Sequence, residues 1–548
     1  MSAPRSSYDY VIVGAGSAGC VLANRLSADP SVRVLLLEAG GRDWHPFIHM
    51  PAGIAKLVGK KGINWNYETQ PQAALCGRRL WWPRGRVLGG SSSINAMCYI
   101  RGDRRDYDEW AELGASGWAW HDVLPYFLRS EQNSRGASDL HGAHGPLAVS
   151  DLKYRNELSH AFLEAAAQYG APASSDFNGD SQAGFGFYQV TQRDGTRCSS
   201  ATAYLHPVHD RENLDVVTGA LAERVQVEAG RAVGISFRRR GTRVTVAAER
   251  EVLLCGGAIN SPQLLMLSGI GPADDLRRLG IMVHADLAEV GGNLQDHLDI
   301  CVLNASDSRA TYDRTNDVRV ALQYLLFRSG IGTSNVAEAG GFARSQWAED
   351  ARCDLQFHFV PALLDDHGRN RLPGRGITLH ACGLRPKSRG RIALASADPA
   401  IAPRIEPNYL GDAENVDLRT LLDALKTSRR LLGQRALDGV RGVELMPGEA
   451  VTDDAGLEDY IRRKAETIYH PVGTCRMGSD TSAVVDPTLC VRGVAGLRVV
   501  DASVMPRLIG GNTNGPTIMI AERASDLLNA VARPRREAAA VGSATMRK

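Results

Sequence analysis

The N-terminal segment constrains the fold of this 548-residue chain more than any other part of the sequence. The apolar run Tyr8–Val13 predicts a buried parallel strand, and it leads directly into Gly14-Ala-Gly-Ser-Ala-Gly19. A helical pattern follows over Cys20–Ser27, and a second apolar strand, Arg33–Glu38, ends on a carboxylate. This order of strand, glycines, helix, strand and acid predicts the first unit of a doubly wound α/β fold that binds a dinucleotide.

Each glycine of this motif has a mechanical role. Gly14 allows the tight turn, Gly16 lets a pyrophosphate approach the backbone, and Gly19 lets the helix pack closely against the strand. The helix N-terminus offers free N–H groups to phosphates, and the terminal acid can accept hydrogen bonds from a ribose. The residues of this segment that we expect to bind the cofactor are Gly14, Gly16, Ser17, Ala18, Gly19, Glu38 and Ala39.

Two later segments favour FAD over NAD as the cofactor. Glu251–Gly257 is an apolar strand that breaks into glycines, and Leu497–Ser503 is a third such strand far along the chain. A cofactor held by segments so distant in sequence is expected to be large and deeply buried, whereas a nicotinamide coenzyme must exchange at each turnover. From these segments and the strand-like run 222–227 we expect contacts from Val225, Gly256, Asp501 and Ala502.

Composition narrows the class of protein. Hydrophobic residues make up 44% and charged residues 23%, which is ordinary for a soluble globular protein. The formal net charge of +2 does not indicate a nucleic-acid partner. The ten cysteines include no C-x-x-C pair, so we expect no metal site. With no secretory signal before the first strand, we interpret the cysteines as reduced thiols of a cytoplasmic protein.

The sequence predicts no transmembrane segment, because no apolar run is long enough to span a bilayer. The tail from Arg533 carries Arg535, Arg536, Arg547 and Lys548 among alanines, and we interpret it as a polar terminus. The alternative is weak electrostatic contact with a membrane surface. We therefore expect a cytoplasmic location and leave peripheral contact with the inner face of the cytoplasmic membrane open.

A histidine and an asparagine near the C-terminal end are the candidate catalytic pair. His470 is followed by Pro471, which fixes the backbone, and an imidazole can take a proton near neutral pH. Asn514 can donate a hydrogen bond to an oxygen that becomes negative during the reaction. We expect the two side chains to meet over one edge of a flavin. A helix that starts at Pro516 would point its positive end at the ring.

Longer motifs carry a resemblance to a known family. Gly85–Asn95 resembles the first signature of the glucose–methanol–choline oxidoreductases, and Gly257–Gly271 resembles the second. His470 stands in an H-P-x-G-T similar to the family's catalytic motif, and Asn514 is placed at its second catalytic position. The resemblance covers nearly the whole chain. Within the family the chain is similar to choline dehydrogenases, and more so to a membrane-associated bacterial alcohol dehydrogenase of alkane degradation.

The resemblance implies an FAD cofactor, a primary alcohol substrate and an electron acceptor other than NAD. Some members bind the flavin covalently through a histidine just before the asparagine of the first signature. That position is Ile94 here, so we expect non-covalent FAD. The further cofactor contacts that the resemblance implies are Arg86, Gly89, Gly90, Ser91, Asn95, Ala96, Met97, Asn512 and Thr513.

The expected reaction is oxidation of a primary alcohol to an aldehyde. His470 takes the hydroxyl proton, Asn514 holds the alkoxide, and a hydride passes to flavin N5, after which a quinone-type acceptor reoxidises the flavin. One alternative is an oxidase that uses O2 and produces H2O2. Another is a choline dehydrogenase, for which Glu338 could supply charge toward the quaternary ammonium or could equally have a structural role. A more remote alternative is an FAD-containing lyase, and the oligomeric state stays open.

Two structural parts are expected. The runs Leu355–Val360 and Gly376–Ala381 alternate with strand period, which predicts a mixed or antiparallel sheet in a substrate-binding cap. The substrate would bind in the cleft between this cap and the flavin domain. The expected boundaries are 1–155, 200–308 and 465–532 for the FAD-binding domain, 156–199 and 309–464 for the cap, and 533–548 for a polar tail.

Other polar clusters are interpreted as loop or solvated residues. His141 and His144 lie close together in sequence, and His206 and His209 are three positions apart. Neither pair has a cysteine or a third ligand nearby, so a metal site is not expected. The run Asp365–His367 is likewise interpreted as a polar loop.

Overall fold

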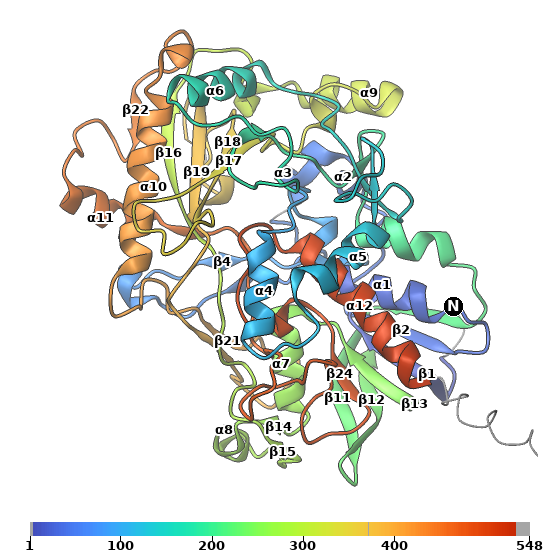
Figure 1. Cartoon of the computed structure of the whole chain (residues 1–548). Helices are drawn as coiled ribbons and strands as arrows, with labels where there is room; N and C mark the ends of the chain where they lie inside the picture. Colours follow the sequence, from blue (N-terminus) through green and yellow to red (C-terminus); the bar gives the residue numbers. More distant parts are fainter. Residues whose placement is uncertain (1–3, 58, 371, 533–548) are drawn as a thin grey trace, which may run out of the picture.

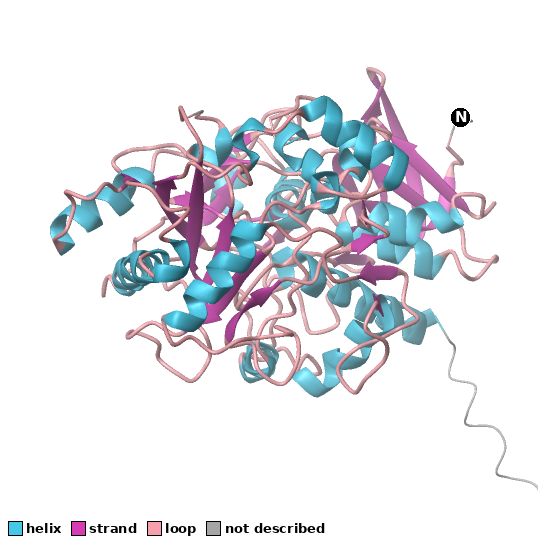
Figure 2. Cartoon of the chain, turned by 90° about the horizontal axis from the view of Figure 1, so that it is seen from above, coloured by secondary structure: helices cyan, strands magenta, loops and turns pink. Residues whose placement is uncertain are grey.

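The protein is built around two separate seven-stranded sheets, with helices and long loops around and between them (Figures 1 and 2). The computed structural model describes residues 4–57, 59–370 and 372–532, so the tail expected at 533–548 lies outside the described residues. Within this described part, no helix combines the length and the apolar character that crossing a membrane requires.

The first sheet has the strand order β10-β2-β1-β13-β12-β11, and β24 also pairs with β13. Its parallel part confirms the expected doubly wound core, since β1 lies between β2 and β13 in parallel register. The antiparallel strands β11 and β12 extend the sheet beyond that core. The strands are β1 (Ser7–Val13), β2 (Val34–Glu38), β10 (Leu214–Thr218), β11 (Ala220–Glu228), β12 (Arg231–Arg239), β13 (Thr242–Leu254) and β24 (Leu497–Val499).

Two helices begin close to the glycine motif that follows β1. Helix α1 (Ser17–Leu26) follows β1, and α12 (Asn514–Ala532) packs between α1 and α5 (Trp120–Ser130) (Figure 1). Helix α12 starts at Asn514, earlier than the expected start at Pro516. Pro516 is tolerated there because the N–H groups of the first helical turn have no partner within the helix.

The second sheet has the order β22-β16-β19-β18-β17-β7, with β23 also paired to β16. Its pairings are antiparallel throughout, as the alternating pattern of the cap predicted. Helix α10 (Val416–Leu432) packs on β16 and β19, and α6 (Glu157–Gln168) packs on β17. The strands are β7 (Gly184–Phe187), β16 (Leu298–Ala305), β17 (Ala339–Ala343), β18 (Leu355–Val360), β19 (Gly376–Gly383), β22 (Glu444–Met446) and β23 (Glu466–Thr467).

The expected domain boundaries differ from the sheet pairing at two places. Strands β16 and β23 lie in the segments 200–308 and 465–532, which were assigned to the FAD-binding domain, yet both belong to the second sheet. A buried apolar strand has the same sequence pattern in either sheet, so only the hydrogen-bond partners decide its place.

Shorter elements complete the chain. The remaining helices are α2 (Pro46–His49), α3 (Ile54–Leu57), α4 (Arg104–Glu112), α7 (Gly257–Leu267), α8 (Ala273–Arg278), α9 (Asp317–Phe327) and α11 (Asp454–Lys464). The remaining strands are β3 (Tyr67–Glu68), β4 (Trp81–Trp82), β5 (Glu131–Asn133), β6 (Leu147–Val149), β8 (Gln192–Arg193), β9 (Thr196–Arg197), β14 (Ile270–Gly271), β15 (Ala285–Asp286), β20 (Arg391–Ala393) and β21 (Arg404–Glu406).

Candidate active site

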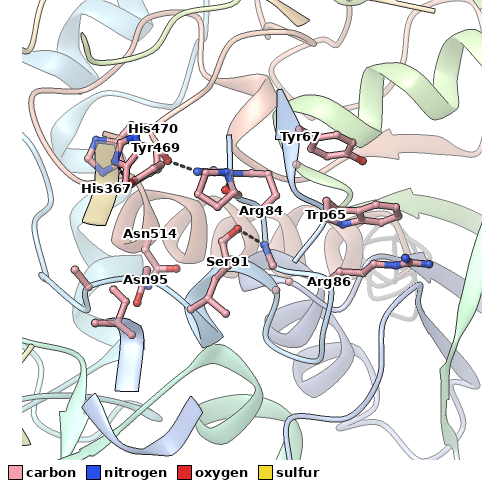
Figure 3. Close-up of a pocket in the computed structure, with 18 of the residues that line it drawn as sticks. Trp65, Tyr67, Arg84, Arg86, Ser91, Asn95, His367, Tyr469, His470 and Asn514 are labelled. Carbon is pink, nitrogen blue, oxygen red and sulfur yellow. Dashed lines mark hydrogen bonds between the residues drawn. The ribbon is translucent and has the colours of Figure 1, made fainter. Parts of the chain in front are cut away.

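A cavity of about 1260 Å³ is lined by residues that lie in, or directly after, strands of both sheets. The first sheet contributes the glycine turn after β1 and the segment after β13, and the second contributes residues of β18 and β19. Figure 3 shows one wall, with Trp65, Arg86 and Tyr67 at one end and His470 and Tyr469 at the other. Such a cavity is large enough for an extended cofactor together with a small substrate.

Two glycine-containing loops touch at the phosphate end of the cavity. A Cβ atom on Gly90 would lie 2.7 Å from the Cα atom of Gly16, and Gly90 has a φ of 53°. A larger residue at Gly90 would therefore push the two loops apart and would also strain its own backbone. Glycine at this contact leaves both backbones accessible to a ligand.

The N-termini of two helices border this part of the cavity. Ser17, at the start of α1, donates a hydrogen bond from Oγ to Asn514 Oδ1 at 2.7 Å. Asn514 is the first residue of α12, and both residues line the cavity. Adjacent helix N-termini provide free N–H groups and partial positive charge, which suit an anionic ligand.

Glu38 lies at the end of β2 with its side chain buried against the cavity. Its carboxylate accepts hydrogen bonds from the N–H of Ala15 at 3.0 Å and of Gly40 at 2.8 Å. Burial nevertheless raises the pKa of Glu38 to about 7. These two bonds hold the carboxylate at the position where a ribose hydroxyl would be recognised.

Arg86 supplies an unused donor at the same end. Its guanidinium lies 4.6 Å from the ring centroid of Trp65 (Figure 3). Its Nε is buried and has no hydrogen-bond partner among the described residues. A buried donor without a partner is costly unless a ligand satisfies it, so this atom indicates a bound acceptor.

Asn95 is held in place by a buried arginine that sequence reasoning missed. Arg197 donates from its Nη1 to Asn95 Oδ1 at 2.8 Å and to the Asn95 carbonyl oxygen at 2.7 Å. Burial lowers the pKa of Arg197 to about 9. Because Arg197 lies more than a hundred positions along the chain, no local pattern connects it with the signature that it supports.

His470 is buried at the other end of the cavity, between two polar partners. Its Nδ1 lies 3.0 Å from His297 Nδ1, and its Nε2 lies 3.2 Å from Asn512 Nδ2. The amide of Asn512 donates to Nε2, so the ring proton of His470 resides on Nδ1 and is donated to His297. Burial lowers the pKa of His470 well below its ordinary value, and the neighbouring histidines add to this effect. The ring is therefore neutral and can accept a proton at Nε2.

The backbone before His470 is fixed by a buried carboxylate. Asp296 accepts a hydrogen bond from the His470 N–H at 2.7 Å and further bonds from Thr467 Oγ1 and the Tyr409 hydroxyl. Arg84 donates to the Tyr469 carbonyl oxygen at 2.7 Å, and Tyr469 adopts a φ of 72°. This strained turn is held on both sides, and it points the imidazole into the cavity.

The side chain that meets His470 is Asn512, whereas Asn514 was expected there. Gln356 of β18 donates to Asn512 Oδ1 at 2.9 Å, which directs the Asn512 amide N–H groups toward His470. Asn514, the first residue of α12, instead accepts a hydrogen bond from Ser17 at the start of α1. The two asparagines stand two positions apart, and the helix start turns their side chains in different directions. The expected pairing of His470 with Asn514 is therefore wrong in this structure.

Comparison with known proteins identifies the family. Family models of the GMC oxidoreductases match residues 8–299 and 386–521. The chain belongs to the GMC oxidoreductase family. It is 52% identical to an alcohol dehydrogenase [acceptor] of Pseudomonas putida, over 95% of each chain, and 46% identical to the mitochondrial choline dehydrogenase of Homo sapiens, over 96% of this chain and 90% of the relative. Among solved structures, an Aspergillus oryzae formate oxidase studied for its FAD modification matches with a TM-score of 0.91 at 26% identity, over 97% and 99% of the two chains.

This GMC oxidoreductase is an FAD-dependent enzyme, and its cavity fits that cofactor. The contact of Gly16 with Gly90 leaves the backbone accessible to the cofactor, and Glu38 is placed to bind the adenosine ribose. The Nε of Arg86 is free to donate a hydrogen bond to the cofactor. The expected cofactor residues that line the cavity are Gly14, Gly16, Ser17, Ala18, Glu38, Ala39, Arg86, Gly90, Ser91, Asn95, Ala96, Met97, Gly256, Asp501, Ala502, Asn512 and Thr513.

Three expected cofactor residues do not line the cavity. Val225 is buried in β11, and the same strand instead lines the cavity at Ala220–Ala222. A Cβ atom on Gly19 would lie 1.9 Å from the carbonyl oxygen of Gly14, so Gly19 serves the packing of α1. Gly89 has a φ of 86° and begins the turn of the first signature. Gly19 and Gly89 therefore serve the backbone geometry, and Val225 serves the hydrophobic core.

Several histidines interpreted as solvated are partly or fully buried. His141 contacts Asp176 at 2.8 Å and Glu131 at 3.2 Å. His367 lines the cavity, contacts Glu466 at 3.0 Å and hydrogen bonds to the Tyr469 hydroxyl. His141 lies in a loop, as expected, but its side chain is not solvated. The polar segment Asp365–His367 borders the cavity at His367. Their acidic and phenolic partners come from other segments, and local sequence does not reveal such pairings.

Glu338 does not face the cavity. Its carboxylate accepts hydrogen bonds from the Asn156 N–H and from the hydroxyls of Ser159, Ser334 and Tyr312. These four hydrogen bonds connect Glu338, the residue before β17, to neighbouring segments of the chain. Of the two roles left open for Glu338, these contacts support the structural one over binding of a quaternary ammonium.

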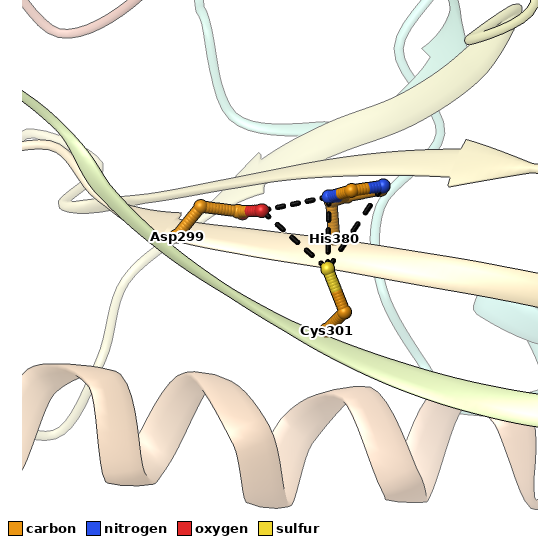
Figure 4. A group of neighbouring side chains, drawn as sticks. All are labelled: Asp299, Cys301 and His380. Atoms are coloured by element: carbon orange, nitrogen blue, oxygen red, sulfur yellow. Dashed lines mark hydrogen bonds and ion pairs between the residues drawn. The ribbon is translucent and has the colours of Figure 1, made fainter. Parts of the chain in front are cut away.

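Asp299, Cys301 and His380 form a polar group at the cavity wall (Figure 4). The Nδ1 atom of His380 lies 2.7 Å from Asp299 Oδ2 and 3.0 Å from Cys301 Sγ. Burial raises the pKa of Cys301 well above its ordinary value, so the thiol stays protonated. A second group joins Asp366, His367 and Glu466. Asp299, His380 and His367 line the cavity, so we interpret these three side chains as polar parts of its wall.

Proposed function

We propose that this enzyme oxidises a primary alcohol to an aldehyde with non-covalently bound FAD and passes the electrons to a quinone-type acceptor. One observation carries the proposal: a buried imidazole, His470, and an oriented amide, Asn512, face the same cavity that the flavin signature lines. The similarity to an alcohol dehydrogenase [acceptor] supports the substrate class and the use of an acceptor.

The roles follow from the hydrogen-bond chain through the site. The substrate hydroxyl contacts both His470 Nε2 and Asn512 Nδ2 from the cavity side; these two atoms lie 3.2 Å apart. His470 accepts the hydroxyl proton at Nε2 while its Nδ1 proton remains directed at His297. Asn512 donates to the oxygen as negative charge develops there. FAD held by the cavity residues would supply the acceptor for the hydride that leaves the carbinol carbon.

The balance of the step is simple. The alcohol loses one proton to His470 and one hydride to the cofactor, and the carbon–oxygen double bond of the aldehyde forms. The N-terminus of α12 borders the cavity at Asn514, and its partial positive charge stabilises the negative charge that the hydride brings. Ile94 lines the cavity at the position where some family members have a histidine that binds the flavin covalently. Its side chain has no group that can form such a bond, which supports non-covalent FAD.

Choline is the second candidate substrate, favoured by one specific observation. Asp299 and His380 place a carboxylate and an imidazole at the cavity wall, and a carboxylate there can attract a quaternary ammonium. The similarity to a choline dehydrogenase supports this candidate. The wall also contains Val360, Ala362, Leu363 and Leu364, which suit an uncharged aliphatic alcohol.

An anaerobic screen tests the proposal. Purified enzyme is mixed with aliphatic alcohols, aromatic alcohols and choline, and bleaching of the flavin absorbance is followed. We expect the fastest bleaching with a primary alcohol, and His470→Ala is expected to slow it about 10²–10⁴-fold, because that is the typical contribution of a general base. Unchanged bleaching in the variant would remove His470 from the mechanism.

Reoxidation of the reduced enzyme then separates dehydrogenase from oxidase. A quinone analogue should reoxidise it much faster than air does, and faster reoxidation by O2 with release of H2O2 would instead identify an oxidase. Acid precipitation should leave the yellow cofactor in the supernatant. Colour retained in the protein pellet would show a covalent flavin and contradict that part of the proposal.

A further inference from the structure

Helix α9 presents an apolar face to solvent at the edge of the molecule (Figure 1). Val318, Leu322, Leu325 and Leu326 stand at positions i, i+4, i+7 and i+8, which places them on one side of the helix. They are between 53% and 70% exposed, and Phe327 beside them is 69% exposed. These five side chains form the α9 apolar face, a concentration of exposed large apolar residues that water alone does not favour.

The orientation of α9 is fixed by its inner side. Tyr324 is buried and donates from its hydroxyl to the His49 carbonyl oxygen at 2.9 Å. Val320 and Ala321, also on the inner side, line the cavity. The α9 apolar face is therefore the outer surface of an element whose inner surface forms part of the cavity wall.

The charges around the face are mostly positive. Arg314, Arg319 and Arg328 are exposed on or next to the helix. The acid at its start, Asp317, forms an ion pair with Lys56 at 3.0 Å, and both of these residues line the cavity. An exposed apolar stripe flanked by arginines is the pattern of helices that lie in the interface of an anionic bilayer.

The size of the face favours lipid over a second copy of the chain. A helix of 11 residues is about 16 Å long and about 10 Å wide, so its footprint is about 160 Å². A stable protein interface buries about 800 Å² on each partner. An interfacial helix needs only to bury its apolar face about 5–10 Å into the boundary between headgroups and acyl chains.

We propose that α9 docks this enzyme on anionic phospholipid bilayers by inserting the α9 apolar face, which holds the part of the cavity wall that α9 forms at the membrane surface. This inference goes beyond the proposed reaction, because docking does not depend on which alcohol or acceptor is used. It assigns membrane contact to α9 instead of the C-terminal tail.

Vesicle flotation of the full-length holoenzyme tests the proposal. Vesicles of phosphatidylcholine with and without phosphatidylglycerol are compared at low and high salt. We expect binding to the anionic vesicles that weakens with salt, because the arginines contribute by charge. Leu322→Glu/Leu326→Glu should bind at least about tenfold more weakly, since each charge prevents burial of the face.

A matched control separates docking from folding. Val443→Glu/Leu445→Glu changes two exposed apolar residues at β22, on the far side of the second sheet from α9 in Figure 1, and should bind vesicles like the wild type. Both double variants should keep their FAD content and their activity with a water-soluble dye acceptor. This activity is measured without lipid, so failure of the proposed alcohol reaction and failure of docking give different results.

Three outcomes would overturn the proposal. The first is absence of wild-type binding to either kind of vesicle. The second is equal binding by Leu322→Glu/Leu326→Glu, or loss of binding only in Arg535→Ser/Arg536→Ser, which would assign the contact to the tail. The third is a wild-type dimer that Leu322→Glu/Leu326→Glu converts to a monomer, which would show that a second copy covers the face.

Discussion

At the residue scale, the site depends on which of two similar asparagines faces the imidazole. Asn512 donates toward His470 Nε2, while Asn514 is occupied by the Ser17 hydroxyl. Both have the same side chain, and both stand in one glycine-rich run. Their different roles come from the start of α12, which changes the backbone direction between them.

The two asparagines should respond differently to the same substitution. Asn512→Ala removes a donor aimed at the developing negative charge, so we expect the rate of anaerobic flavin bleaching to fall about 10²–10³-fold. Asn514→Ala is the matched control, and its main effect should be on FAD affinity because its partner is Ser17 at the phosphate end. A larger loss of bleaching rate in Asn514→Ala would contradict this assignment and support the pairing of His470 with Asn514 that the sequence predicted.

His141 should make the stability of the protein depend on pH. Burial lowers the pKa of His141, but hydrogen bonds to Asp176 and Glu131 outweigh this and raise it to about 9. A raised pKa means that the stabilisation is fully present below about pH 6.5 and is lost as the pH rises through about 9. It amounts to at most about 3 kcal/mol, at about 1.4 kcal/mol per pKa unit.

Thermal melting of the wild type and His141→Gln between pH 6 and 10 measures this effect. The difference in Tm between them should be largest at the acidic end and should shrink as the pH approaches the alkaline end. His209→Gln, at an exposed histidine, should follow the wild-type curve. A difference in Tm that is constant with pH would show that the pKa of His141 is the same in the folded and unfolded states, which contradicts the prediction.

At the element scale, the cofactor site is formed where loops from separate elements touch. The turn between β1 and α1 meets the first signature at the contact of Gly16 with Gly90. The contact lies beside the N-termini of α1 and α12, so a small displacement there would move the donors that face the phosphates. The packing of these loops is thus part of the binding site.

Gly90→Ala should weaken FAD binding more than it weakens the fold. Its Cβ atom would lie 2.7 Å from the Cα of Gly16, so one loop must shift. Gly62→Ala is the control, because Gly62 also has a positive φ but its Cβ would meet nothing within 4 Å. Flavin fluorescence released on dilution measures affinity. Equal FAD loss in both variants would attribute the effect to backbone strain instead of the contact.

At the scale of the whole molecule, the two sheets complete one another at the site. Gln356 of β18, in the second sheet, orients Asn512, which lies just before α12 on the first sheet's side. His297 and Asp296 precede β16 and hold the ring and the backbone of His470. The mutual position of the two sheets therefore sets the geometry of the proposed proton transfer.

Gln356→Leu tests this coupling between the sheets. Loss of the bond to Asn512 Oδ1 frees the amide to rotate, so kcat should fall roughly 10-fold or more while FAD content and KM change little. Asn304→Leu makes the same kind of change at a buried amide of β16 whose donor bond goes to the Gly442 carbonyl oxygen. Its kcat should stay near the wild-type value. Equal losses in both variants would indicate a general weakening of the second sheet.

The sequence by itself determined the elements whose signals are local. The strand–glycine–helix–strand unit through Glu38, the alternating strands at 355–360 and 376–381, and the two flavin-site motifs are each contained in a short run. Local patterns suffice there because turn geometry, strand period and glycine contacts depend on neighbours in the chain.

Only the tertiary structure decided how these parts meet. It showed that Asn512 and not Asn514 faces His470, that β16 belongs to the second sheet, and that Arg197 and Gln356 support the site from distant segments. Each of these depends on hydrogen bonds between residues far apart in sequence. The direction of a side chain at a helix start, and the sheet that an apolar strand joins, are fixed by packing of the folded chain and leave no mark in the local pattern.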